Sequence, residues 1–190
     1  MRGGHGIDVG SHLAHNESHM AHSAAADAPA RLAPDAPGGD VARFHRFLHE
    51  GPPGPHAYAV LLGLDVFDTP ELLRSIRRGF PYRTLERFQR NTSLALDRIT
   101  ELVDIPRRTL TRRKSEGRLL PAESDRLLSA SRLFGRALAL FEGDRDAAAD
   151  WLTAPQRALG GGVPIELART ELGAREVESV LGRLEQGVFL

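Results

Sequence analysis

Apolar residues recur at intervals of three and four along most of the chain after Tyr58. This spacing places them on one face of a helix. The longest such stripe lies on a predicted helix that begins at Pro121 and is closed by Gly143, and its members are Leu127, Ala130, Phe134, Leu138 and Phe141. No pair of segments alternates between apolar and polar residues as paired strands do. The pattern therefore predicts an all-α protein.

Capping residues, prolines and glycines divide the remainder of the chain into shorter predicted helices. The residues Gly51-Pro52-Pro53-Gly54-Pro55 are expected to stop a short helix at 44–48. The others are 69–79, with Thr69 as N-cap and Pro70 in the first turn; 81–90; a helix capped by Ser93; 106–117; 144–152, with Asp144 as N-cap; a short helix from Pro164; and 173–187.

Residues 99–110 have the form of a helix-turn-helix. The first helix is expected to turn Ile99 and Val103 toward the core. A three-residue turn then returns Ile105 to the core, and Leu110 of the second helix packs against the first. The turn holds Asp104 where glycine is common, and Asp adopts the left-handed conformation more readily than most residues.

The second helix of this motif is rich in side chains that bind DNA. Arginine reads guanine through two parallel hydrogen bonds, and threonine contacts a thymine methyl group or a phosphate. The candidate DNA-binding residues are Arg107, Arg108, Thr109, Thr111, Arg112, Arg113 and Lys114. The alternative interpretation is a solvated basic helix without a role in DNA binding.

The chain carries 25 basic and 25 acidic residues, but their distribution is uneven. Residues 83–118 contain ten Lys and Arg against five Asp and Glu, whereas residues 142–190 contain five against nine. The first region suits contact with phosphate, and the second suits a partner of a different kind.

Several classes of protein do not fit the sequence. The absence of cysteine excludes disulfides, cysteine zinc sites and a cysteine nucleophile. The Gly160-Gly161-Gly162 segment lacks the lysine of a phosphate-binding loop, and no metalloprotease or nucleophile signature occurs. We therefore expect no enzymatic activity, no cofactor and no metal. No long apolar run or signal peptide is visible, so we expect a cytoplasmic protein without a membrane partner.

Residues 1–40 are rich in Gly, Ala, Pro and His and show no apolar periodicity. We interpret them as a disordered tail that can be removed without loss of function. Five of the eight histidines lie here: His5, His12, His15, His19 and His22. Their spacing is irregular and no acidic cluster accompanies them, which favours a solvated tail over a metal site.

The C-terminal region contains four closely spaced motifs. They are W-L-x-x-P from Trp151, L-G-G-x-x-P-x-E-L from Leu159, T-x-x-G from Thr170 and V-x-x-x-L-x-R-x-E-x-G from Val177. The segment T-L-x-R-R-K-x-E-G-R-L begins upstream at Thr109. Together they resemble the MbcA/ParS/Xre antitoxin family, with the C-terminal motifs matching its toxin-binding domain. The resemblance covers roughly residues 58–190.

The resemblance implies a helix-turn-helix DNA-binding domain joined by a long helix to a small helical toxin-binding domain. The expected boundaries are a disordered tail at 1–40, an N-terminal helical region at 41–122 with the helix-turn-helix at about 93–117, a connecting helix at 123–142 and a toxin-binding domain at 143–190.

The resemblance also implies the function. The chain is expected to be the antitoxin of a type II toxin–antitoxin system whose partner is a RES-type toxin that consumes NAD. It would occlude the toxin's active site and repress its own operon. One recognition helix reads only a few base pairs, so we expect an inverted repeat bound by a homodimer or by a higher assembly with the toxin.

The glycine turn and the C-terminal end are the candidate surfaces for the toxin. Glycine lets a backbone approach another surface closely, and an apolar chain end is unfavourable in water unless something covers it. The candidates are Gly160, Gly161, Gly162, Arg183, Glu185, Gln186, Gly187, Val188, Phe189 and Leu190. Trp151 is expected in the core instead.

Two other functions stay open at this stage. One is a helix-turn-helix transcriptional regulator with a C-terminal dimerisation domain and no toxin. The other is a protein-localisation adaptor. A neighbouring gene for a RES-type toxin would separate the antitoxin from both.

Overall fold

The structure is a computed structural model, and it describes residues 30–187. Helices account for its regular structure, and two isolated bridges, Leu32 with Leu64 and Pro81 with Arg118, are the strand-like pairings in this range. The prediction of an all-α protein is therefore confirmed. The elements are α2 (Gly39–Glu50), η1 (Ala57–Leu62), α3 (Thr69–Arg78), α4 (Arg83–Thr92), α5 (Leu96–Leu102), α6 (Arg107–Glu116), α7 (Pro121–Leu140), α8 (Arg145–Thr153), η2 (Arg157–Leu159), α9 (Pro164–Leu167) and α10 (Glu171–Glu185).

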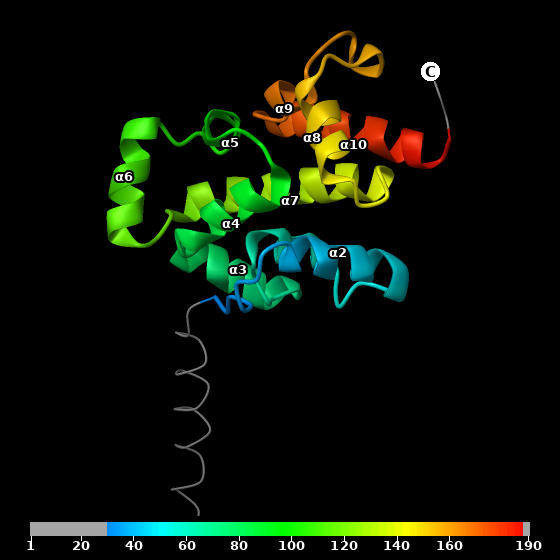
Figure 1. Ribbon diagram of the computed structural model, residues 1–190. Coiled ribbons are helices and arrows are strands. Elements are labelled where there is room, and N and C mark those ends of the chain that lie inside the picture. Colours follow the sequence, from blue (N-terminus) through cyan, green and yellow to red (C-terminus); the bar gives the residue numbers. More distant parts are fainter. Residues whose placement is uncertain (1–29, 188–190) are drawn as a thin grey trace, which may run out of the picture.

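Helix α7 is the central element of the fold. It runs between α2 and α3 on one side and α8, α9 and α10 on the other (Figure 1). The stripe predicted from Leu127 to Leu138 is buried along its length, and Phe141 beyond its end is partly buried. A Cβ atom at Gly135 would lie 3.1 Å from Tyr58 Cβ, so this glycine lets η1 pack closely against α7.

One connected apolar core joins the two ends of the chain. Phe80 and Ile99, which precede α7, belong to the same cluster of buried side chains as Ile165, Val177 and Leu181, which follow it. The helix-turn-helix region and the C-terminal helices therefore share α7 as a common wall. None of the helices between residues 30 and 187 has the length and apolar character needed to cross a membrane.

Several predicted helix starts are displaced: α2 begins at Gly39 and not at residue 44, and α10 begins at Glu171 and not at residue 173. The N-cap of α3 is Asp68, whose carboxylate accepts a hydrogen bond from Glu71 N at 2.9 Å, and not Thr69. Ser93 was predicted to cap α5, but it ends α4 at φ 56, and this left-handed turn brings Leu94 into the core. Pro81 pairs with Arg118 instead of opening α4. Asp144 does cap α8 as predicted, accepting bonds from two backbone N–H groups.

The predicted tail of residues 1–40 is wrong for its last part, because residues 30–40 pack against the folded body. The guanidinium of Arg87 donates to Asp40 and to the carbonyl oxygens of Ala33 and Pro34. The Arg87 and Asp40 side chains are 3% and 5% exposed. Hydrogen bonds to the buried guanidinium of Arg87 hold this segment in place. The spacing of apolar residues gives no sign of such polar contacts. Residues 1–29, with the five histidines, lie outside the described residues.

Candidate DNA-binding helix and C-terminal surface

Helices α5 and α6 and the turn between them form a helix-turn-helix. Ile99, Val103 and Ile105 are at most 1% exposed, and Leu110 is 7% exposed, as the motif requires. Asp104 adopts the left-handed conformation with φ 53, and its carboxylate lies 3.4 Å from Arg126. These observations confirm the predicted packing of the motif.

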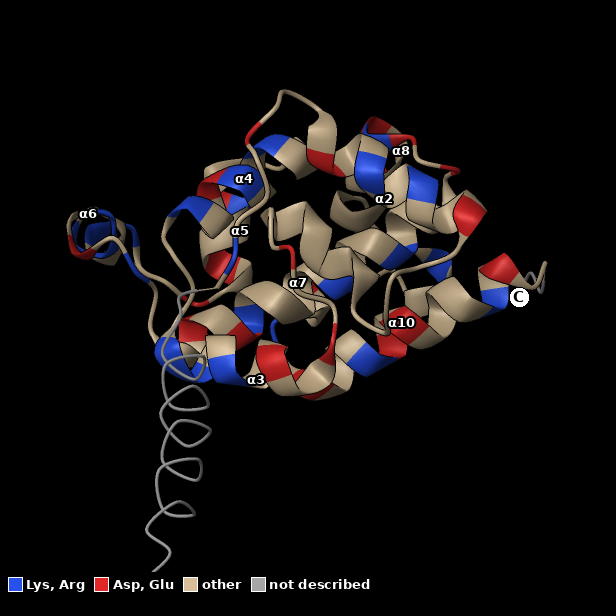
Figure 2. Cartoon of the chain, turned by 90° about the horizontal axis from the view of Figure 1, so that it is seen from below, with Lys and Arg blue, Asp and Glu red and all other residues tan. Residues whose placement is uncertain are grey.

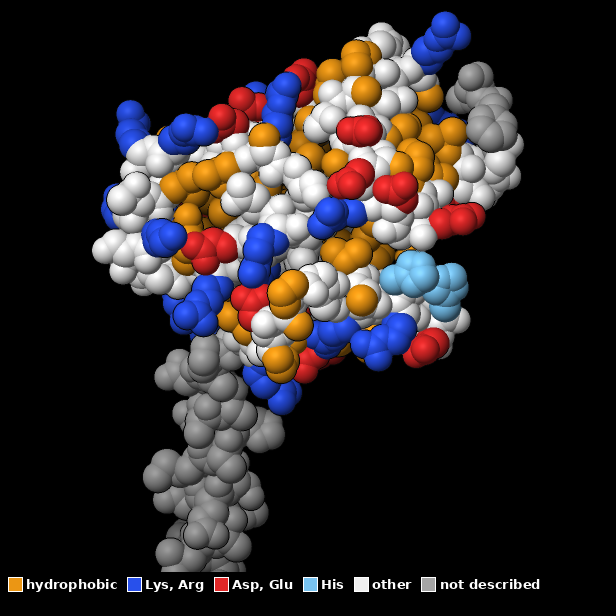
Figure 3. All heavy atoms as spheres, in the orientation of Figure 1, with side chains coloured by type: hydrophobic (Ala, Val, Ile, Leu, Met, Phe, Trp, Pro, Cys, Tyr) orange, Lys and Arg blue, Asp and Glu red, His pale blue; other side chains and the backbone are white. Residues whose placement is uncertain are grey.

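Helix α6, in the position of a recognition helix, lies at the edge of the molecule (Figures 1 and 2). Leu110 is its single apolar side chain, so it has almost no hydrophobic face with which to dock. Lys and Arg side chains are prominent along this edge of the surface (Figure 3). The helix therefore presents a mainly basic and polar surface to solvent.

The prediction that Arg113 belongs to the DNA-binding residues is wrong, because its side chain faces the protein interior. It is 4% exposed. Its Nε lies 2.8 and 3.0 Å from the carboxylate oxygens of Glu123, and its Nη1 donates to Glu116 at 2.7 Å. The bond to Glu123 raises the pKa of the Arg113 guanidinium. Arg113 therefore fixes α6 to the start of α7 and is not available to DNA.

The other predicted residues of α6 lie at the surface. Arg107 pairs with Asp97, and Lys114 Nζ lies 3.1 Å from a Glu86 oxygen, which raises the pKa of Lys114. These pairs are solvent-exposed and hence weak, so a phosphate can replace either carboxylate. Arg108 has no ion pair among residues 30–187. The exposed members are Arg107, Arg108, Thr111, Arg112 and Lys114, and Thr109 is half-buried.

The predicted glycine turn is a compact loop closed by its own backbone. Gln156 N donates to Gly162 O at 3.0 Å, and Gly161 N donates to Gln156 O at 2.9 Å. Gly160 and Gly161 have φ values of 64 and 85, and a Cβ atom at either would meet nothing within 4 Å. The loop therefore offers an open face to a partner while its backbone is held in place. Trp151 is partly buried against the core, in line with its predicted role.

The C-terminal end of α10 holds the other candidate residues. Arg183 donates to Ser179 at 2.8 Å, and Glu185 lies 3.7 Å from Arg136 of α7. Gly187 follows at φ 72 and is exposed, as is Gln186. Helix α10 packs against η2, the short helix that leads into the glycine loop. The candidates Val188, Phe189 and Leu190 lie outside the described residues.

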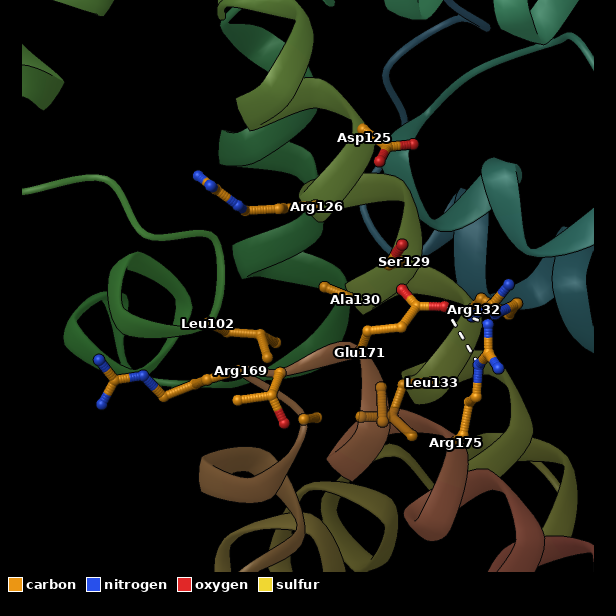
Figure 4. A pocket seen from close by; sticks show the side chains of 13 residues that line it. Leu102, Asp125, Arg126, Ser129, Ala130, Arg132, Leu133, Arg169, Glu171 and Arg175 are labelled. Atoms are coloured by element: carbon orange, nitrogen blue, oxygen red, sulfur yellow. Dashed lines mark hydrogen bonds and ion pairs between the residues drawn. The ribbon is translucent and has the colours of Figure 1, made fainter.

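Two features of this region were missed in the sequence. Leu172, at the start of α10, is 81% exposed, the largest exposure among the large apolar side chains of residues 30–187. It lies off the apolar stripe of its helix, and that is the signal that could have identified it. A cavity of about 250 Å³ also lies between α5, α7 and the start of α10 (Figure 4). Its walls come from segments far apart in the chain, so no local motif predicts it.

Two known domain families match the chain, one after the other. It matches the antitoxin Xre-like helix-turn-helix domain over residues 71–132 and the antitoxin Xre/MbcA/ParS C-terminal toxin-binding domain over residues 136–187. Antitoxin Xre of Yersinia enterocolitica serotype O:8 / biotype 1B is 37% identical over 129 residues, which cover 67% of this chain and 87% of that protein. Antitoxin Xre of Photorhabdus laumondii subsp. laumondii is 32% identical over 120 residues, covering 63% and 81%.

The two matched domains follow each other in the order that the structure shows, with the helix-turn-helix first and the C-terminal helices second. The relatives align over most of their own length, so the likeness extends across both domains. The chain belongs to the Xre/MbcA/ParS antitoxin family and is an antitoxin with a DNA-binding helix-turn-helix domain and a toxin-binding domain.

Proposed function

We propose that this antitoxin neutralises a RES-type, NAD-consuming toxin by occluding its active cleft, and that it represses its own operon by binding an inverted repeat. The observation that supports this proposal best is the union, in one chain, of an exposed basic recognition helix and a domain matched as toxin-binding. The assignment of the toxin to the RES class rests on the family resemblance.

Occlusion requires surface complementarity and no chemistry from the antitoxin. Residues 142–190 carry nine acidic residues against five basic ones. A cleft that binds the phosphates of NAD is expected to be basic, so the charges are complementary, which favours encounter and choice of partner. We assign the contact to the open face of the loop at 160–162 and to the chain end from Gln186 onward. Within α10, Arg183 and Glu185 border that end.

The test is co-expression with a RES-type toxin whose gene neighbours the gene of this antitoxin. Growth and cellular NAD are then measured. We expect the antitoxin to restore both. The matched control is the double variant Arg107→Ala/Arg108→Ala, which should protect fully because it leaves the C-terminal surface intact. NAD loss in the presence of soluble, folded antitoxin would refute neutralisation.

The same double variant tests the DNA half of the proposal. Each good base contact contributes about 1–3 kcal/mol, so operator binding should weaken by roughly 2–5 kcal/mol. A gel shift on the promoter region measures this change, and mass measurement of the complex should show two copies on one inverted repeat. Unchanged affinity together with unchanged sequence preference would remove α6 from the role of recognition helix.

A further inference from the structure

A surface hollow of about 410 Å³ lies where the helix-turn-helix meets the C-terminal domain. One wall comes from α5, the turn at 104–106 and Arg107, the first residue of α6. The other wall is Arg169, from the segment that joins α9 to α10. A residue of the toxin-binding domain therefore stands beside the amino end of the recognition helix.

The position of Arg169 is fixed relative to the helix-turn-helix. Arg98 of α5 donates to Glu166 of α9 at 3.1 Å, which ties the two helices together. The backbone N of Arg169 in turn donates to Glu166 O at 3.4 Å. Figure 4 shows the Arg169 side chain passing Leu102 of α5, away from Glu171 and on the same side as Arg126. The guanidinium thus extends beside α5, while Arg169 also forms part of the wall of the neighbouring cavity.

Arg169 contributes a positive charge to this hollow that is not paired with a carboxylate among residues 30–187. Each carboxylate of the hollow already has an arginine partner, in the pairs Asp97 with Arg107, Glu101 with Arg98 at 3.5 Å and Asp104 with Arg126 at 3.4 Å. Arg169 itself is exposed, and its side chain has no ion pair or hydrogen bond within residues 30–187. No carboxylate is therefore left over to neutralise it.

Docking geometry suggests what Arg169 meets. The N-terminal residues of a recognition helix point into the major groove, and the phosphate backbone runs along the rim of that groove. Arginines beside the recognition helix usually contact these phosphates, which positions the protein without reading sequence. We propose that Arg169 binds a DNA phosphate next to α6, so that the toxin-binding domain contributes to operator affinity. The proposal rests on DNA binding through α6.

The experiment measures the affinity of the full-length Arg169→Ala variant for operator and for random DNA over a range of salt concentrations. We expect about a threefold to tenfold loss on both DNAs, the effect of losing one typical hydrogen bond at a solvent-exposed surface. The slope of log K against log salt should fall by about one, because one phosphate contact is lost. Arg169→Lys should retain part of the affinity, since lysine binds phosphate as a point charge.

The matched control is Arg175→Ala. Arg175 lies on α10, is highly exposed and pairs with Glu171, outside the hollow, so its loss should leave DNA binding unchanged. Unchanged affinity and slope in Arg169→Ala, or loss of toxin neutralisation by that variant, would overturn the proposal, the second outcome placing Arg169 on the toxin surface. The Arg107→Ala/Arg108→Ala variant separates the claims. If the double variant loses DNA binding while Arg169→Ala does not, only the proposed phosphate contact of Arg169 is refuted. If neither variant loses DNA binding, DNA binding through α6 is refuted as well.

Discussion

The Nε atom of Arg113 lies 2.8 and 3.0 Å from the two carboxylate oxygens of Glu123, and both side chains are more than nine-tenths buried. Glu123 also accepts a hydrogen bond from Leu120 N at 2.7 Å, so one carboxylate fixes the link between α6 and α7. Because α6 has little apolar surface of its own, this buried pair fixes where the candidate DNA-binding residues of α6 lie. Arg113 therefore acts on the candidate DNA-binding surface through the position of α6 and not through its own exposure.

Replacing Arg113 with methionine should destabilise the protein by about 3–5 kcal/mol, since it leaves the Glu123 carboxylate buried without its partner. Chemical denaturation measures the change. The control is Arg112→Met, whose side chain is 62% exposed and whose loss should alter stability by no more than about 0.5 kcal/mol. Adding Glu123→Gln to Arg113→Met removes the stranded charge and should recover part of the loss. Equal stabilities of the Arg112 and Arg113 variants would contradict the role of the pair.

The sequence predicted the helix-turn-helix well because its constraints are local. The inward positions follow from helical spacing, and Asp104 occupies the left-handed turn that its residue type tolerates. The sequence did not show that Arg113 is buried while Arg112 is exposed. This difference depends on the carboxylate of Glu123, which lies on the next helix, beyond the turn that follows α6. Arg113 does lie three residues after the buried Leu110, on the same helical face, and this was the available signal.

The start of the folded body was missed for a related reason. Residues 30–40 have the composition of a tail. The hydrogen bonds that hold them in place come from Arg87, which lies more than forty residues later in the chain. The starts of α8 and α9 were predicted closely because Asp144 and Pro164 mark them, whereas α10 begins at Glu171, after its cap Thr170 and before the predicted start at residue 173. The cavities and the Arg169 hollow combine distant segments, so only the folded chain reveals them.

Two truncations should differ sharply in stability. Removal of residues 1–29 keeps every contact described for Arg87, so folding, operator binding and toxin neutralisation should persist. Removal of residues 1–40 takes away Asp40 and the carbonyl groups that Arg87 binds, so the guanidinium loses every partner described for it together with part of the packing around it. We expect a loss of about 3–5 kcal/mol in unfolding free energy, measured by denaturation. Equal stability of the two proteins would show that Arg87 finds other partners.

A side chain added to the glycine loop should interfere with the toxin and not with folding. Asparagine tolerates the left-handed conformation of Gly160, and a Cβ atom there meets nothing within 4 Å. Gly160→Asn should therefore fold, yet bind the toxin about tenfold or more weakly, because overpacking a contact costs about 1–3 kcal/mol. Calorimetry with purified toxin measures the affinity. Gly117→Asn is the control, since Gly117 has φ 70, equally open space and a place at the end of α6. Equal affinities of the two variants would take the loop out of the interface.

Ending the chain after Gly187 should release the toxin while DNA binding persists. The truncation removes Val188, Phe189 and Leu190, and burial of such side chains at an interface contributes about 1.5–3 kcal/mol each before ordering costs. Helix α10 ends at Glu185 with Gln186 as its cap, so the shortened chain keeps all of its described helices. Growth and NAD are measured during co-expression with the toxin, with a gel shift on the same protein. A full-length variant with serine at positions 188–190 tests whether apolar character, and not chain length, is required. If the truncated antitoxin protects as well as the full chain, the extreme C-terminus is not part of the mechanism, and the glycine loop and the rest of α10 must suffice for occlusion.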